Sequence, residues 1–282
     1  KDIEEILFGK ENYPYKFKVC WQDKKEKKYE FAIEEFLVDT LKKKFQWHLP
    51  TPEIKPKGPN LVKNPGFEEF DEKGYLKHWQ RHDGLTMFIK DTKEGPGGND
   101  TKILHLKTTV MCKQFLERQE QMLLDNPPPA PKPIEVTDKN KYASVGASYG
   151  VSFYSEPIPI KKGITYQIEI DEFGECAGLS LEFHAKIFVK GYSKLQHKGK
   201  ERERIHYKMY MPCRNQSGLW EHFKQVFSPT YKTPQVEYIR VMIYAYWPNG
   251  DYYFDNVSIR EVGDHNIYNK YIHDDKSVPM KK

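Results

Sequence analysis

The sequence lacks any run of eighteen apolar residues, which is about the length that a helix needs to cross a bilayer. No transmembrane segment is therefore predicted. It also lacks a block of one charge sign, because 45 basic and 40 acidic residues are interspersed and leave a net charge of only +5. Nucleic-acid-binding domains usually gather their basic residues in a patch or stripe. No nucleic-acid partner is therefore predicted.

Catalytic and metal-binding motifs are also missing. The four cysteines form no Cys-x-x-Cys pair, and no G-x-S-x-G, H-E-x-x-H, P-loop or dinucleotide fingerprint is present. A glycosidase needs two carboxylates across a cleft. Glu182 is one candidate, whereas Glu169 and Asp171 would only neighbour it. We predict a non-catalytic protein and keep an undetected hydrolase as the last-ranked alternative.

Aromatic residues, by contrast, are abundant. They make up 14% of the chain, and aromatic and β-branched side chains suit pleated sheets. Short alternating segments separated by turn residues follow one another without intervening helices, which predicts an all-β sandwich or barrel. The predicted strands are 87–91, 102–110, 164–173, 179–192, 203–211, 219–227, 236–247 and 251–262.

The beginning of the chain differs in composition from the rest. Residues 1–47 form a small N-terminal segment with one alternating stretch, 15–23, that predicts a strand. An amphipathic helix is predicted over 29–45, with acidic residues early and lysines late, as the helix dipole favours. Four prolines then make 48–59 an extended linker.

The main domain is predicted over residues 60–262. It is interrupted at 111–142 by a helical stretch and a proline-rich stop, which together predict an insertion in a loop of the sandwich. Residues 263–282 form a polar C-terminal tail. Because a segment as short as 1–47 rarely buries enough apolar surface alone, we expect it to pack on the main domain or on a partner.

Alternation along the strands separates two faces, since successive side chains of a strand point to opposite sides of its sheet. One face is aliphatic and is the predicted core side; in 203–211 it carries Ile205, Tyr207, Met209 and Met211. The other face mixes Tyr, His, Glu, Lys and Arg. This polar face is either a solvated surface or a shallow binding cleft, because flat rings stack on sugars and charged groups bond their hydroxyls.

Three motifs stand in order along the main domain. "NLVKNPGFEEF" opens it at 60–70, "YSEPIPIKKGITYQIEI" follows at 154–170, and "GDYYFDNVSIREV" closes it at 250–262. In this order, with Trp79 between the first two, they resemble the carbohydrate-binding modules of families 4, 9 and 22, which have a galactose-binding-like jelly roll. The resemblance covers the main domain apart from the insertion. It implies a jelly-roll β-sandwich with its first and last strands close together and Trp79 in the core.

The resemblance also implies a structural calcium ion near those two strands. Its ligands would be Glu68 of the opening motif and Asp255 of the closing one, with Gly66 as a carbonyl donor. Calcium is a hard cation that accepts carboxylate and carbonyl oxygens. The alternative is that Glu68 caps backbone amides and Asp255 makes a turn hydrogen bond without a metal. Glu69 is expected to be a surface charge.

The ligand that the resemblance implies is a glycan, bound on the concave sheet face or in loops at the sandwich edge. Trp220 and Trp247 are loop-edge candidates, although each is expected rather in the core. The candidates on the sheet face are Glu182, His184, Tyr210, Arg240, Tyr244 and Tyr246. A module of this kind implies export to the periplasm, the cell surface or the medium.

The chain departs from the family pattern by its N-terminal segment, its insertion and the lysines across the predicted cleft. The second hypothesis is therefore a scaffold or assembly subunit that binds protein partners through 1–47 and 111–142 and has no sugar site. Two cysteines are expected at one end of the sandwich, because the strand 164–173 ends near Cys176 and a later antiparallel strand ends near Cys213. We therefore predict a Cys176–Cys213 disulfide.

Overall fold

A computed structural model describes residues 17–22, 28–33, 55–99, 101–176, 185–197, 200–213 and 218–265. The chain divides into two compact units, Lys1–Ile54 and Lys55–Lys282. The division therefore falls inside the proline-rich stretch 48–59.

The first unit contains an antiparallel hairpin of β1 (Phe17–Gln22) and β2 (Lys28–Ile33). The strand predicted in 15–23 is confirmed. The helix predicted from Tyr29 is wrong over β2, where the aromatic and aliphatic residues have the two-residue period of a strand and Phe31 pairs with Val19. The remainder of that predicted helix lies outside the described residues.

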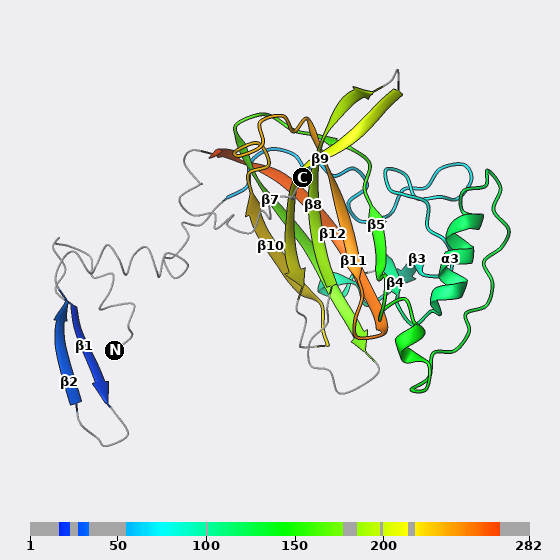
Figure 1. The fold of residues 1–282 in the computed structure, drawn as a ribbon, viewed down its shortest axis with the longest axis horizontal. Coiled ribbons are helices and arrows are strands. Elements are labelled where there is room, and N and C mark those ends of the chain that lie inside the picture. The colour runs from blue at the N-terminus through cyan, green and yellow to red at the C-terminus, as the bar shows by residue number, and fades with distance from the viewer. Residues whose placement is uncertain are drawn as a thin grey trace. The chain divides into compact units, whose positions relative to one another are not determined.

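The second unit is a sandwich of two antiparallel sheets, shown in Figure 1. The first sheet has the order β10-β7-β12-β4-β3, and the second has the order β5-β11-β8-β9, with β6 paired to β11. The strands are β3 (Met87–Thr92), β4 (Thr101–Lys107), β5 (Val151–Tyr154), β6 (Ile158–Pro159), β7 (Ile164–Cys176), β8 (Ala185–His197), β9 (Lys200–Cys213), β10 (Glu221–Phe227), β11 (Tyr238–Ala245) and β12 (Gly250–Asp264). Short 3-10 turns lie at Pro96–Gly98 (η2) and Lys141–Ala143 (η3).

The connections give the sandwich its jelly-roll character. Along the chain β4, β7, β10 and β12 belong to the first sheet, whereas β5, β8, β9 and β11 belong to the second, so most connections cross between the layers. One continuous core lies between the two sheets and takes residues from both, such as Ile168 and Phe254 from the first and Ile187 and Val241 from the second. The predicted all-β jelly-roll sandwich is therefore confirmed.

Trp79 lies in this core, as the resemblance implied. Its side chain is 6% exposed and stacks on Phe153, with 5.6 Å between ring centroids. Its ring N–H donates to the carbonyl of Asn64 at 3.1 Å, which satisfies its polar atom. Trp79 therefore joins the opening motif to the second sheet.

The opening motif is tied to the last strand. The side-chain oxygen of Asn60 accepts from the Ile259 amide at 3.0 Å, and its side-chain N–H donates to the carbonyl of Val257 at 3.0 Å. The Val257 amide in turn donates to the carbonyl of Pro65. The expected closeness of the two ends of the domain is confirmed.

The insertion forms a helix and an extended return. A bridge between Met111 and Ser144 closes its base, and α3 (Cys112–Gln121) begins directly after it. The guanidinium of Arg118, only 5% exposed, donates to the carbonyls of Asp83 at 2.7 Å and Pro128 at 2.8 Å. This buried arginine joins the proline-rich return to both the helix and the sandwich, and the predicted helix with its proline stop is confirmed.

One predicted core residue is wrong. The β8–β9 register shifts between Gly191 and Tyr192, so Ile205 is 38% exposed although Tyr207 and the two methionines after it are buried. A bulge inserts a residue and reverses the alternation beyond it. His206, beside it, hydrogen-bonds Ser193 at 2.7 Å.

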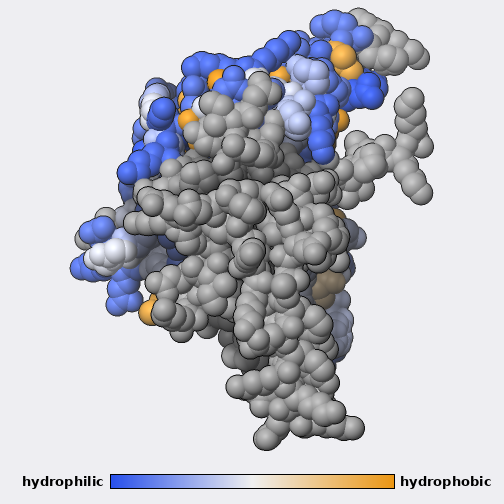
Figure 2. Space-filling view, turned by 90° about the vertical axis from the view of Figure 1, so that its left-hand side faces the viewer, coloured by the Kyte–Doolittle hydropathy of each residue, from blue (hydrophilic) through white to orange (hydrophobic). Residues whose placement is uncertain are grey.

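No helix in the described part of the chain is long and apolar enough to cross a membrane. On the side of the molecule shown in Figure 2, the described residues are mostly hydrophilic, with single hydrophobic side chains among them.

Candidate functional site

The predicted binding face is the outer surface of the second sheet. Phe188 of β8 lies at its centre, with its ring centroid 5.9 Å from Tyr210 of β9 and 6.0 Å from Tyr244 of β11. Tyr244 also stacks on Tyr246 at 5.5 Å. The structure therefore brings together three of the predicted tyrosines around a phenylalanine that was not among the candidates. Its place in the alternation could have identified it.

Lysines lie over the rings of this surface. The ammonium of Lys186 is 4.8 Å from the centroid of Tyr246 and 3.3 Å from its hydroxyl oxygen. Lys208 lies 4.8 Å from the centroid of Phe188. A cation over a ring face is attracted by the ring quadrupole, so a ligand that stacks on these rings must move or bind the ammonium groups. We call this outer surface the tyrosine face; its members are Lys186, Phe188, Lys190, Lys208, Tyr210, Arg240, Tyr244 and Tyr246.

Arg240 lies on the tyrosine face but at some distance along β11 from the tyrosines. Its guanidinium binds Glu203 at 2.9 Å, and Glu203 also accepts from the Tyr238 hydroxyl at 2.7 Å. Hydrogen bonds from Tyr238 and Arg240 lower the pKa of Glu203 below its ordinary value. Arg240 is therefore an ion-paired residue at the far end of the face. The candidates Glu182 and His184 lie outside the described residues.

The chain just after the insertion closes one edge of the tyrosine face. The hydroxyl of Tyr244 donates to the carbonyl of Tyr149 at 3.1 Å. The next residue, Gly150, has φ +67°, and a Cβ there would lie 2.4 Å from the Tyr244 ring. Only glycine lets the backbone pass this close to the ring.

The loop-edge tryptophans do not join the tyrosine face. Trp220 donates its ring N–H to the carbonyl of Glu94 at 2.7 Å and contacts Phe173 of the first sheet. Trp247 stacks on Tyr142 of η3 at 6.0 Å. Both indoles are half-buried, so neither is the fully buried core residue that was expected.

Glu68 and Asp255 meet at the joined ends of the domain, as predicted. Glu68 accepts from the Lys102 amide at 2.8 Å and from the Thr101 hydroxyl at 3.0 Å. The same hydroxyl lies 3.3 Å from Asp255, whose other oxygen accepts from the Asn256 amide at 2.7 Å. These contacts match the metal-free alternative, in which Glu68 caps an amide and Asp255 makes a turn hydrogen bond.

The electrostatics of this pair nevertheless suit a cation. Asp255 is 1% exposed, and burial, with further contributions from the charges of Asp171 and Glu68, raises its pKa to about 7. A Cβ on Gly66 would lie 3.5 Å from an Asp255 oxygen, so the Gly66 backbone lies beside the carboxylate. Within the described ranges no three His, Cys, Asp or Glu side chains form a metal-binding group. A calcium ion would therefore need backbone carbonyls besides the two carboxylates, which calcium accepts.

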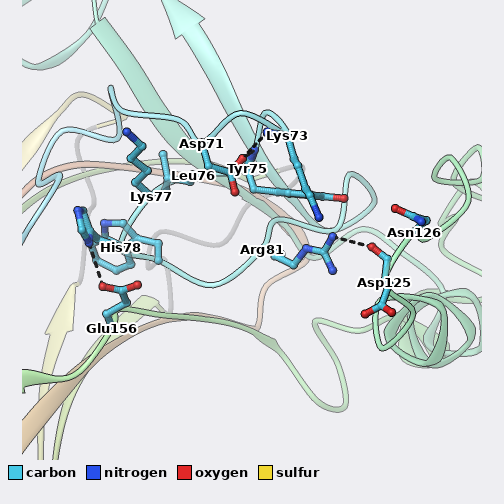
Figure 3. Close-up of a pocket in the computed structure, with 11 residues that line it drawn as sticks. Asp71, Lys73, Tyr75, Leu76, Lys77, His78, Arg81, Asp125, Asn126 and Glu156 are labelled. Atoms are coloured by element: carbon cyan, nitrogen blue, oxygen red, sulfur yellow. Dashed lines mark hydrogen bonds and ion pairs between the residues drawn. The ribbon is translucent and has the colours of Figure 1, made fainter.

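An open pocket of about 710 Å³, missed by the sequence analysis, lies next to the edge strand β5. Figure 3 shows Arg81 reaching toward the insertion, where it binds the Asp125 carbonyl at 3.3 Å, and His78 paired with Glu156 at 2.9 Å. The Arg81 guanidinium also lies 4.1 Å from the centroid of Tyr75. Arg81, His78 and Glu156 are thus already bound to neighbouring groups of this pocket.

The predicted Cys176–Cys213 disulfide is wrong. Cys213 is a free thiol with 0% exposure inside the core, and burial, followed by the charge of Glu172, raises its pKa well above the ordinary value. Cys213 pairs with Ala185 in the second sheet, whereas Cys176 pairs with Gly250 in the first. The two cysteines thus belong to strands of different sheets, and the free Cys213 thiol is what overturns the predicted bridge.

Comparisons with known proteins give similarity only at the level of solved structures. No protein-family model and no curated protein matches the chain. A family 61 carbohydrate-binding module in complex with β-1,4-galactotriose is 13% identical with a TM-score of 0.36, covering 72% of this chain and 99% of its own. The CBM22-1 xylan-binding domain of Paenibacillus barcinonensis Xyn10C is 12% identical with a TM-score of 0.39, covering 74% and 98%.

Larger proteins also match over part of their length. The enzymatically active domain of tailspike protein 4 of bacteriophage CBA120 is 8% identical with a TM-score of 0.42; the match covers 72% of this chain but only 21% of that one. Carbohydrate-binding modules are thus among the similar structures, as the sequence resemblance led us to expect. At these identities and scores the similarity establishes neither a family nor a ligand.

Proposed function

We propose that the second unit is a non-catalytic module that binds a glycan across the tyrosine face. The observation that carries this proposal is the group of aromatic rings around Phe188, with Tyr210 40% exposed among amine and hydroxyl groups. Apolar ring surface beside a few polar groups is the composition of sugar-binding sites. The resemblance of the opening and closing motifs to carbohydrate-binding modules supports the same reading.

The test is affinity electrophoresis against a panel of polysaccharides. We expect retardation of the wild-type protein, and its loss in F188A and Y210A. Tyr231→Ala is the matched control, because Tyr231 is 46% exposed in the β10–β11 loop and outside the tyrosine face. If F188A and Y210A are both still retarded, the ligand binds elsewhere on the protein, for instance in the pocket beside β5.

Calcium binding by Glu68, Asp255 and the Gly66 carbonyl is part of the proposal. A bound calcium ion would neutralise the buried carboxylate of Asp255 and the exposed carboxylate of Glu68, and would thereby link the first segment of the domain to the last strand. Chelator is expected to lower the melting temperature of the wild-type protein. An unchanged melt, with no calcium found in the purified protein, would remove this part. Export to the periplasm, the cell surface or the medium is proposed only as a consequence of glycan binding.

A scaffold role is the second candidate. It is favoured by apolar side chains that the insertion leaves exposed: Leu123 is 86% exposed and Ile134 is 56% exposed. Exposed apolar surface is one feature of protein contact sites. If no polysaccharide retards the protein and partner proteins co-purify only while these two residues are intact, the scaffold role replaces the glycan role. Contacts through 1–47 stay a prediction.

A further inference from the structure

Three cations lie in direct cross-strand register on the tyrosine face. Lys190 of β8 pairs with Arg240 of β11 on one side and with Lys208 of β9 on the other. Directly opposite residues of antiparallel strands have Cβ atoms about 5 Å apart, and like charges in such positions destabilise a sheet. The row therefore opposes the stability of the second sheet.

Only one of the three cations is compensated by an anion. Arg240 binds Glu203, as described above. Lys190 instead contacts the Tyr154 hydroxyl at 3.0 Å, and Lys208 lies over the ring of Phe188. In the described part of the chain, no carboxylate lies within ion-pair distance of Lys186, Lys190 or Lys208.

Rings lie between this row and a further lysine. Phe188 pairs with Tyr210 on one side and Met242 on the other, one step of the same face beyond Lys190. Lys186 is the next step and lies over Tyr246. Since residues two apart on a strand are separated by about 7 Å, the lysines stand on both sides of the Phe188–Tyr210 pair. The ammonium group of Lys208 reaches over the Phe188 ring and that of Lys186 over the Tyr210 ring.

We propose that the ligand of the tyrosine face is an acidic polysaccharide, whose sugar rings contact the Phe188–Tyr210 pair while its carboxylate or sulfate groups bind Lys186, Lys190 and Lys208. This inference rests on the proposed glycan-binding function and names its ligand class. A neutral glycan uses the rings alone and leaves three ammonium groups without an anion. An acidic one supplies charge-assisted hydrogen bonds to all three.

Single-stranded nucleic acid also combines anions with flat rings, but the face fits it less well. Proteins that bind such strands carry a basic groove that follows several phosphates. Among the described residues of the tyrosine face, the cations without an ion pair are the three lysines. One side of the face is closed by Tyr149, and the β8–β9 ends beyond the row carry Glu201 and Glu203. The charged area therefore suits a few anionic groups.

The experiment compares polygalacturonate with the same polymer after methyl esterification, which keeps the sugar chain and removes its charge. Alginate, heparin, xylan, a neutral β-glucan and a single-stranded oligonucleotide complete the panel. Titrations with wild-type protein should show binding to polygalacturonate, alginate or heparin, and at least about tenfold weaker binding to the esterified and neutral polymers. Binding to the polyuronates would show that carboxylates suffice, whereas binding to heparin alone, which carries both groups, would point to its sulfates.

Two double variants separate the roles. K190Q/K208Q should bind the acidic polymers at least about tenfold more weakly, whereas K224Q/K232Q, which removes the same charge from exposed positions off the tyrosine face, should bind like wild type. A melting curve for each checks folding. Binding to neutral glycans that depends on Tyr210 but not on the lysines would overturn the acidic assignment and keep the glycan function. Binding to none of the polysaccharides would overturn both. Preferential, lysine-dependent binding of the oligonucleotide would overturn the glycan assignment.

Discussion

Asp255→Asn is expected to stabilise the calcium-free protein at neutral and alkaline pH. The carboxylate of Asp255 is buried near Glu68 and Asp171, and its pKa is raised from 3.8 to about 7. The folded state therefore binds a proton that the unfolded state has released, and stability falls as the pH rises between these two values. Each pKa unit corresponds to about 1.4 kcal/mol, so the ionised carboxylate costs the folded state about 4 kcal/mol above pH 7.

The stability difference between Asp255→Asn and wild type should change with pH in one direction only. Below about pH 4 both states hold the proton, so wild type and Asp255→Asn should unfold with similar free energies. As the pH rises, the variant should gain stability relative to wild type, and the difference should level off above the folded pKa of about 7. Asparagine keeps an oxygen to accept from the Asn256 amide, so the turn hydrogen bond survives the substitution.

The measurement is urea unfolding at closely spaced pH values in the presence of chelator. Asp138→Asn is the control, because the Asp138 side chain is 98% exposed and forms a surface ion pair with Lys141. The difference between this control and wild type should stay flat with pH. Parallel curves for wild type and Asp255→Asn would refute the reasoning. Added calcium should close the gap by stabilising wild type alone, and a gap that calcium leaves unchanged would argue against the metal site while leaving the pKa intact.

Two further predictions follow from the core and the edge of the tyrosine face. In the native protein a thiol reagent should modify the half-buried Cys112 and leave Cys213 unmodified, because burial keeps the Cys213 thiol inaccessible and protonated. Mass spectrometry measures the modification, and finding the reverse pattern, or a disulfide at Cys213, would contradict the structure. Gly150→Ala should lower the melting temperature more than Gly58→Ala, since both glycines have positive φ but only a Cβ at 150 would strike Tyr244; equal effects would mean that the contact with Tyr244 is not formed.

Much of the sandwich could be predicted from local patterns. The alternation in 236–247 correctly assigned the core-facing row of β11, because the two-residue period is a property of any strand, although Tyr238 and Met242 of the other row are also only 6% exposed. The asparagines of the opening motif also have a structural reason. Asn60 bonds the last strand, while Asn64 is 5% exposed and bonds the backbone of Glu69 and Lys77. These hydrogen bonds join the opening segment to the rest of the domain, and the two asparagines of the motif are the residues that make them.

Other features could not be predicted because they depend on distant partners. The helix expected over residues 29–45 is replaced at its start by β2, where pairing with β1 prevails over helical periodicity. Ile205 faces solvent because of a β-bulge, which the alternation of residues along the strand does not predict. The disulfide prediction failed because it used only the order of the strand ends along the chain, whereas in the fold Cys213 is a free thiol buried in the core.

The sequence by itself determined the all-β class, the insertion and the two faces of most strands, because these follow from local periodicity and turn residues. The meeting of Glu68 with Asp255 was implied by the resemblance of the opening and closing motifs to carbohydrate-binding modules. Only the tertiary structure decided which strands are neighbours and in which register. That register sets Lys190 opposite both Arg240 and Lys208 and places Phe188 among the tyrosines. Strand register is fixed by pairing between segments far apart in the chain, so the charge of the tyrosine face emerges only once the sheet has formed.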